Sequence, residues 1–112
     1  MSDLLTLARA QLDAGDAGSS RRACWLARSA MEEALDTLLL ERGVDTGPLA
    51  STRAKLSCLE VTYDDEPGLA ARAQYAWTRL SEACHHHAYE LSPTALEARD
   101  LVDAVSRLTD RC

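Results

Sequence analysis

The stretch SRRACWLARSAMEEALDTLLLER, residues 20–42, decides the fold of this 112-residue chain. Its apolar residues recur at spacings of three and four, which places them on one face of an α-helix. Gly43 follows at once, and glycine is typical of the position just beyond a helix end. The sequence therefore predicts a long amphipathic helix with one buried face. That face consists of Ala23, Leu26, Ala27, Ala30, Met31, Ala34, Leu35 and Leu38.

Helical patterns also occur on both sides of this stretch. We expect helices over about 2–14, 51–63 and 66–88, and a fifth that begins close to residue 93. The chain is thus predicted to be one all-α domain, an up-and-down bundle of four to five helices over residues 1–112. The residues expected to face its core are Leu5, Ala8, Leu12, Leu56, Leu59, Tyr63, Leu69, Ala73, Ala76, Leu80, Ala83, His87, Ala98, Leu101, Val102, Val105 and Leu108.

The segment 51–63 is open to two interpretations. Leu59, Val61 and Tyr63 alternate as in a strand, whereas Leu56, Leu59 and Tyr63 fit a helix. We favour the helix, because no partner strand is visible in the rest of the sequence.

Residues typical of helix starts mark the other boundaries. A serine caps a helix by accepting a hydrogen bond from its first turn, and proline suits that turn because its missing N–H group would have no partner there. Threonine followed three residues later by glutamate forms a capping box. The expected positions are Ser19 or Ser20, Pro67, Pro93, and Thr94 with Glu97.

The composition is that of an ordinary globular domain. Hydrophobic residues make up 46% and charged residues 27%, and no apolar run approaches the length of about 20 residues needed to span a membrane. The N-terminal stretch lacks the pattern of a signal peptide, so we expect a cytoplasmic location. Lys55 is the only lysine, and Ile, Asn and Phe do not occur. Because these residue types have AT-rich codons, we infer a high-GC bacterial genome.

Charge and cysteine usage narrow the function further. The net charge of −6 opposes non-specific wrapping of nucleic acid, although it leaves room for a local basic groove. The four cysteines form no CxxC motif, and in a cytoplasmic protein we expect them to be reduced. Cys24, Cys58 and Cys84 stand among apolar residues and are predicted to fill the core.

The stretch RLSEACHHHAYE, residues 79–90, holds all the histidines of the chain. Successive helical residues turn by about 100°, so Arg79 and His86 share a face. His85 points away from Arg79 unless the helix ends or loosens there, and His87 falls on the inward side. The other polar residues of this region are Arg72 and Glu82, on the side of Arg79, and Tyr89 beside the helix end.

This pattern resembles the HEPN superfamily (higher eukaryote and prokaryote nucleotide-binding domains). These are small α-bundles whose signature is an arginine followed, after four to six residues, by a histidine late in the chain. Five residues separate Arg79 from His85 and six separate it from His86, so both histidines fit. The run His87-Ala88-Tyr89 looks like the HxY ending of many members. Members often have a polar residue directly after the arginine, where this chain has Leu80.

The resemblance implies a metal-independent ribonuclease without a cofactor, in which the RNA 2′-hydroxyl attacks the adjacent phosphate. Arg79 would hold the phosphate, and His85 or His86 would transfer protons near neutral pH. It also implies a homodimer with both motifs in one cleft, and a toxin-like role in a bacterial defence or toxin–antitoxin system beside an antitoxin partner. The further candidate contacts to RNA are Arg72, Glu82, His87 and Tyr89.

Arginine and tryptophan residues on other helical turns are secondary candidates. Arg21 and Arg28 form a basic stripe that is able to contact phosphate, but we favour a solvated face on which Arg28 pairs with Glu32. Trp25 and Trp77 are able to stack on nucleobases. Large aromatic residues beside apolar stripes are more often buried, and burial is what we predict for both.

Less specific interpretations of the histidine segment stay open. Adjacent helical residues diverge, and the only ligand-type residue four positions from His85 is Tyr89, so we expect no metal site from this segment alone. Arg79, Glu82 and His86 also fit a polar helix face with a salt bridge. The alternatives to a ribonuclease are a non-catalytic HEPN-like module that binds a nucleotide, nucleic acid or protein, and a plain helical interaction domain.

Overall fold

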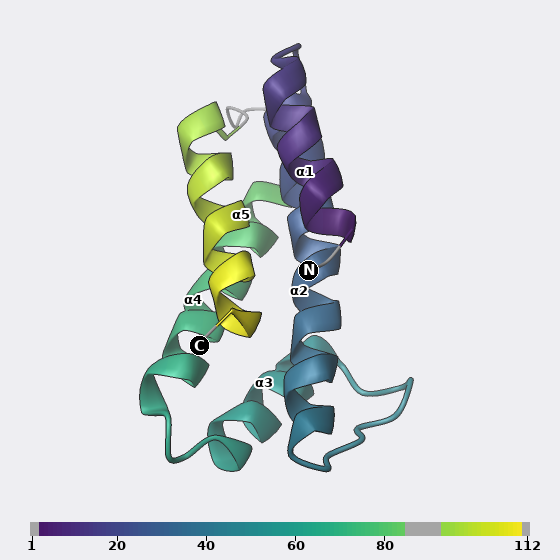
Figure 1. Ribbon diagram of the computed structural model, residues 1–112, viewed down its shortest axis with the longest axis vertical. Coiled ribbons are helices and arrows are strands. Elements are labelled where there is room, and N and C mark those ends of the chain that lie inside the picture. The colour runs from purple at the N-terminus through teal and green to yellow at the C-terminus, as the bar shows by residue number, and fades with distance from the viewer. Residues whose placement is uncertain (1–2, 85–92, 111–112) are drawn as a thin grey trace.

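The computed structural model describes residues 3–84 and 93–110, which form helices and no strand. The predicted all-α class is confirmed, and the segment that also fitted a strand is helical. Figure 1 shows helices running up and down beside one another, with the helix formed within segment 51–63 at one end of the bundle. The elements are α1 (Asp3–Ala14), α2 (Ser19–Glu41), α3 (Thr52–Thr62), α4 (Pro67–Cys84) and α5 (Ala95–Thr109).

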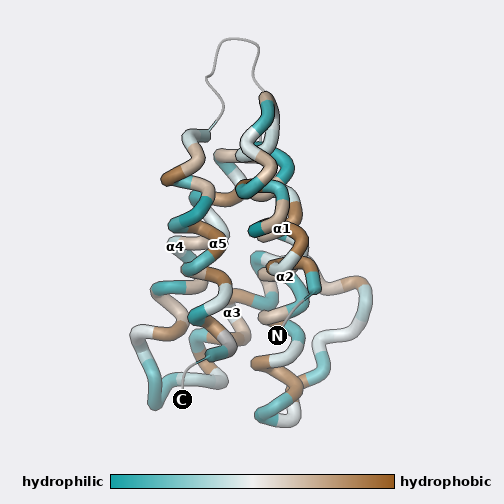
Figure 2. The backbone as a smooth tube through the Cα atoms, turned by 45° about the horizontal axis from the view of Figure 1, so that its top comes forward, coloured by the Kyte–Doolittle hydropathy of each residue, from teal (hydrophilic) through white to brown (hydrophobic). Residues whose placement is uncertain are grey.

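The central element is α2, the helix expected from the stretch at 20–42. It packs against α1, α3, α4 and α5. Its predicted apolar face is buried except for Leu26, which is partly buried against the core. In Figure 2 hydrophobic and hydrophilic segments alternate along the helices, as expected for helices with one buried side.

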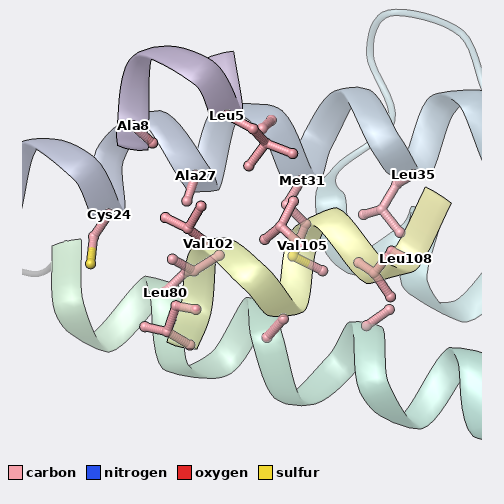
Figure 3. Close-up of a cluster of buried hydrophobic side chains, with 14 of the residues drawn as sticks. Leu5, Ala8, Cys24, Ala27, Met31, Leu35, Leu80, Val102, Val105 and Leu108 are labelled. Carbon is pink, nitrogen blue, oxygen red and sulfur yellow. The ribbon is translucent and has the colours of Figure 1, made fainter. Parts of the chain in front are cut away.

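The other helices supply the rest of one continuous core. Leu5 of α1, Leu80 of α4 and Val102 of α5 are buried around the middle of α2 (Figure 3). Of the residues expected on the core-facing sides of the helices, all that the structure describes are buried apart from Leu26 and Ala83, which are partly buried against the same cluster. Cys58, predicted to fill the core, is also only partly buried there. His87 lies outside the described residues.

The turn between α1 and α2 differs from the predicted serine cap. Gly18 occupies the cap position with a left-handed φ of 89°, and Ser19 is already the first residue of the helix. The Ser19 hydroxyl donates to Asp16 Oδ1 at 2.7 Å, because the turn brings this carboxylate back to the helix start. Arg22 also pairs with Asp16, and these two contacts hold the pKa of Asp16 below its ordinary value. The carboxylate of Asp16, rather than a serine cap, therefore organises this turn.

The start of α5 bears out the predicted capping pair with one change. The Thr94 hydroxyl accepts a hydrogen bond from the Glu97 N–H at 3.1 Å, and it donates to Glu97 Oε1 at 3.2 Å. The helix begins at Ala95, so Pro93 precedes the cap instead of lying in the first turn. Pro67 is the first residue of α4, as predicted. The expected continuation of that helix beyond Cys84 lies outside the described residues.

Ion pairs also join neighbouring helices on the outer surface. Arg9 of α1 lies 3.2 Å from Asp103 of α5, and Lys55 of α3 lies 2.8 Å from Asp36 of α2. The Lys55 side chain is only 13% exposed, so its alkyl chain adds packing as well as charge. Over the part of the chain that the structure describes, no helix has both the length and the apolar character needed to cross a bilayer.

Candidate functional site

Arg79 lies on α4, five residues before its end, and reaches toward α5. Its side chain is 44% exposed, and Nη2 is 4.0 Å from Oε2 of Glu97. The ion pair expected for a polar helix face is thus formed between helices, and its partner is not Glu82. Contacts of this length between exposed groups contribute little to stability, so the guanidinium donors stay accessible to another anion.

The remaining candidates on α4 are spread around the helix. Arg72 and Glu82 are both exposed, and neither forms an ion pair among the described residues. Leu80, directly after Arg79, is fully buried in the core. The positions of His85, His86, His87 and Tyr89 lie outside the described residues, so the partner histidine of Arg79 stays a prediction.

The second group of candidates meets where the N-terminal half of α2 faces the C-terminal half of α4. The guanidinium carbon of Arg28 lies 4.8 Å from the centre of the Trp77 ring and 5.6 Å from that of Trp25. We call Trp25, Arg28 and Trp77 the Arg28 cluster. Within the described ranges Arg28 forms no ion pair, so the expected pairing with Glu32 is wrong. Two aromatic rings attract the cation more closely than the carboxylate one turn along the helix.

The two tryptophans of the cluster differ in burial. Trp77 is partly buried and packs against the core, in line with the prediction. Trp25 is 51% exposed, so the prediction that it belongs to the core is wrong. The physical reason lies in its position on α2, where the neighbouring Cys24 takes the fully buried place.

Two buried thiols lie beneath this cluster. Burial raises the pKa of Cys24 from 9.0 to about 11, and the neighbouring Cys84 adds to the effect, whereas Arg21 opposes it. Burial also raises the pKa of Cys84, although Arg28, through its charge and a hydrogen bond, and Arg21 act in the opposite direction. Both arginines of the predicted basic stripe therefore approach the end of α4, the helix that carries Arg79. The thiols are protonated near neutral pH and serve as core residues, as predicted.

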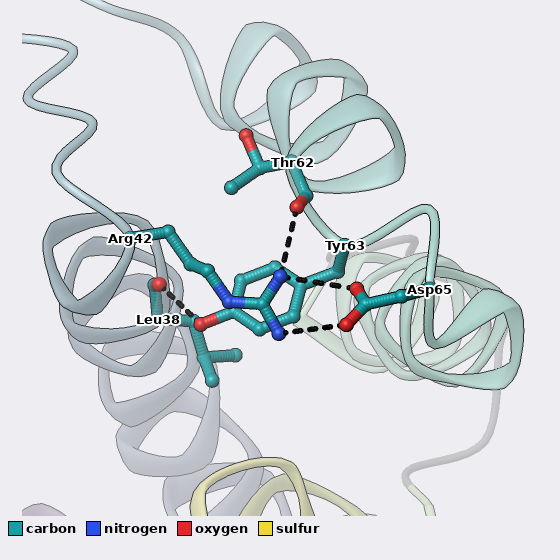
Figure 4. A network of polar contacts seen from close by, with 5 residues as sticks. All are labelled: Leu38, Arg42, Thr62, Tyr63 and Asp65. Carbon is teal, nitrogen blue, oxygen red and sulfur yellow. Dashed lines mark hydrogen bonds and ion pairs between the residues drawn. The ribbon is translucent and has the colours of Figure 1, made fainter.

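A third polar arrangement, at the other end of α2, was missed by sequence reasoning. Arg42 lies over the ring of Tyr63, with its guanidinium carbon 4.0 Å from the ring centre. Its two terminal nitrogens donate to the two carboxylate oxygens of Asp65 at 3.0 and 3.2 Å, and one also donates to the Thr62 carbonyl at 3.3 Å (Figure 4). The Tyr63 hydroxyl donates to the Leu38 carbonyl at 2.6 Å.

We call these five residues the Arg42 network. They join the end of α2 to the turn between α3 and α4. The hydrogen bonds to Asp65 raise the pKa of Arg42 above its ordinary value. The only signal in the sequence is a tyrosine and three acidic residues before a proline, and this pattern does not indicate a contact with an arginine some twenty positions earlier.

Over residues 3–84 and 93–110, no group of three histidine, cysteine, aspartate or glutamate side chains is placed to hold a metal ion. The histidine run itself lies outside these ranges. The cationic groups that the structure places near the end of α4 are Arg79, which reaches toward α5, and Arg21 and Arg28 of α2.

Neither the known protein-family models, nor the curated proteins, nor the solved structures contain a match to this chain.

Proposed function

We propose that this protein is a HEPN-like, metal-independent endoribonuclease that works as a homodimer in a bacterial defence or toxin–antitoxin system. The observation that carries the proposal is the state of Arg79. Its guanidinium is exposed near the end of α4, and the ion pair with Glu97 is long, at 4.0 Å. In the sequence, five residues separate Arg79 from His85 and six separate it from His86. The helical bundle that the described residues form is also consistent with the architecture of that superfamily.

The chemistry requires one cation and one group that moves protons. The 2′-hydroxyl oxygen of RNA attacks the adjacent phosphorus while its proton passes to a base, and the bond to the 5′-oxygen breaks as that oxygen takes up a proton. The products are a cyclic phosphate and a 5′-hydroxyl. Histidine suits the proton transfer because it titrates near neutral pH. Arg79 would bind the phosphate oxygens and stabilise the charge that develops on them.

The test compares RNA cleavage by the wild type, Arg79→Ala and a matched control, Arg53→Ala, which removes an exposed arginine on α3. We expect Arg79→Ala to cleave about a hundredfold to a thousandfold more slowly, as when one transition-state donor is lost. Arg53→Ala should cleave like the wild type. Expression of the wild type should also slow growth, and Arg79→Ala should relieve that effect. A wild type that cleaves no RNA, or equal cleavage by all three proteins, contradicts the proposal.

The second candidate is a non-catalytic HEPN-like module that binds RNA, a nucleotide or a protein partner such as an antitoxin. It is favoured by Leu80, because a fully buried leucine offers no polar group at the position after Arg79. Retained RNA binding without any cleavage by the wild type distinguishes this candidate from the ribonuclease. Light scattering of the purified protein tests the proposed homodimer under either function.

A further inference from the structure

We propose that the Arg28 cluster is a binding subsite for a nucleobase and its phosphate in single-stranded RNA. Trp25 would stack on the base, and the N–H groups of Arg28 would bind the phosphate. The inference deepens the proposed function and rests on it only for the choice of RNA as the polymer.

Arg28 and Arg42 both contact aromatic rings. The guanidinium carbon of Arg28 lies 4.8 and 5.6 Å from the centres of two rings, and that of Arg42 lies 4.0 Å from the centre of one ring. A contact with the ring face leaves the N–H donors in the guanidinium plane able to bind an anion. Arg42 shows this use directly, because its terminal nitrogens hold both oxygens of Asp65.

Arg28 has the same stacking without the anion. Among the described residues no carboxylate lies within ion-pair distance of it, and its one polar contact is to the thiol of Cys84. That thiol is protonated near neutral pH, because burial raises its pKa, so it does not neutralise the cation. A guanidinium held in place by two rings with its donors available is suited to a phosphate, which accepts several hydrogen bonds at once.

Trp25 differs from Tyr63 in its exposure. Tryptophan is the residue type that forms the strongest cation–π contacts. In the Arg42 network the aromatic ring that contacts the cation, Tyr63, is buried, with 1% of its surface exposed. Trp25 instead remains 51% exposed while it contacts Arg28. An exposed indole beside a cation is the combination used to bind single-stranded nucleic acid, since bases stack on the ring while the cation follows the backbone.

The charge near the Arg28 cluster differs from that of the whole chain. The whole chain has a net charge of −6, which disfavours the binding of phosphate in general. At this place, however, Arg28 and, seven residues earlier on the same face of α2, Arg21 both approach the end of α4, where Glu97 is the acidic residue that acts on Cys24. Nucleic acid is therefore directed to this restricted part of the surface.

The experiment uses the fluorescence of the protein itself. The chain has two tryptophans, and both belong to the Arg28 cluster, so selective excitation of indole reports on this subsite alone. The probe is a short single-stranded RNA with 2′-O-methyl ribose, which lacks the hydroxyl that attacks in cleavage. We expect saturable quenching of the emission. Arg28→Gln should weaken binding about tenfold, and Trp25→Ala by about the same factor, measured from the emission of Trp77. Arg53→Gln, which removes an exposed arginine of α3, should bind like the wild type.

Further measurements distinguish binding of the base together with its phosphate from binding of phosphate alone. A nucleoside monophosphate should quench more weakly than the oligonucleotide, and inorganic phosphate should compete only at higher concentration. If phosphate competes as well as the oligonucleotide, the base contact with Trp25 is wrong. If Arg28→Gln loses helical structure by circular dichroism, Arg28→Lys replaces it, since lysine keeps the charge but not the planar donors. Binding by Arg28→Lys equal to the wild type then contradicts the proposal.

Two results distinguish this inference from the proposed function. Quenching that depends on Arg28, together with failure to cleave unmodified RNA, leaves the subsite standing and overturns the ribonuclease. Cleavage that depends on Arg79 without quenching overturns the subsite alone. Without RNA, the emission should not depend on protein concentration. If it does, and if light scattering shows a doubled mass that Trp25→Ala abolishes, Trp25 forms a contact between two copies of the chain. That result also overturns the subsite.

Discussion

Two arginines at the two halves of α2 contact aromatic rings, yet they differ in what else they contact. Arg42, at the C-terminal end, binds Asp65 through two nitrogens and the Thr62 carbonyl through one of them. Arg28, in the N-terminal half, lies over two tryptophans and has no carboxylate partner among the described residues. An arginine within α2 and the arginine directly after its last residue therefore have different surroundings.

The difference shows which polar groups the fold already uses. In the Arg42 network the aromatic ring is buried, its hydroxyl is bonded, and the cation is paired with a carboxylate across a turn. Such a network stabilises a single arrangement and leaves little for a ligand. In the Arg28 cluster one ring is half exposed and the cation has no carboxylate partner among the described residues, which is typical of a surface that gains free energy by binding. The predictions that follow test this contrast, beginning with the largest effect.

Replacing the buried ring of the Arg42 network should destabilise the protein most. Tyr63 is 1% exposed, so Tyr63→Ala leaves a cavity and removes the bond to the Leu38 carbonyl. We expect the free energy of unfolding to fall by about 3–5 kcal/mol, as for other large buried aromatic residues. The measurement is urea denaturation followed by circular dichroism. Tyr75→Ala is the matched control, since Tyr75 is 60% exposed and should cost less than about 0.5 kcal/mol. Equal losses in both variants contradict a structural role for the network.

The buried thiols beneath the Arg28 cluster should make the protein sensitive to alkaline pH. Burial raises the pKa of Cys24 from 9.0 to about 11, so the folded state disfavours the thiolate. The stabilising effect is complete below the unfolded pKa and is lost as pH rises from about 9 to about 11, with at most about a hundredfold change in the folding equilibrium constant.

Urea denaturation at several alkaline pH values checks this, with Cys24→Ala as the reference that keeps all other titrating groups. The stability of the wild type should decline more steeply than that of Cys24→Ala across this window. Parallel curves show that the thiol is accessible to water, and the cluster then does not cover it.

A smaller change inside the Arg42 network isolates one hydrogen bond. Tyr63→Phe keeps the ring beneath Arg42 and removes the hydroxyl that donates to the Leu38 carbonyl at 2.6 Å. We expect a loss of about 1 kcal/mol in the free energy of unfolding, the usual contribution of one internal hydrogen bond. A loss as large as that of Tyr63→Ala assigns the effect to the hydroxyl and not to the buried ring. The same denaturation assay decides between the two.

The contrast also explains which features of the protein could be predicted from its sequence. The apolar stripe of α2 followed from spacing alone, because residues three and four apart share a helix face. The helix of α3 followed from spacing together with the lack of a partner strand in the sequence. The capping pair Thr94 and Glu97 was found for the same reason, since both partners lie within one turn. Local pattern was sufficient wherever the interacting residues are close in the chain.

Features that depend on long-range packing could not be predicted in this way. The sequence favoured an ion pair between Arg28 and Glu32, but in the structure Arg28 contacts the ring of Trp77 on α4. The pair of Arg42 and Asp65 joins the end of α2 to the turn between α3 and α4, and the pair of Arg79 and Glu97 joins α4 to α5. The serine cap of α2 was wrong because the turn geometry at Gly18 brings in Asp16. Which histidine faces Arg79 stays a prediction for the same reason, since it depends on how the chain leaves α4.

The variant Arg28→Gln should have the smallest effect on stability, and it distinguishes the Arg28 cluster from the Arg42 network most directly. Arg28→Gln removes a partly exposed cation–π contact, so we expect a loss of only about 0.5–1 kcal/mol in the free energy of unfolding. The same variant should bind single-stranded RNA about tenfold more weakly. A residue whose loss affects binding more than folding belongs to a surface that the fold keeps for a ligand. If Arg28→Gln instead destabilises the protein more than Tyr63→Phe and leaves binding unchanged, the Arg28 cluster is a structural clamp like the Arg42 network.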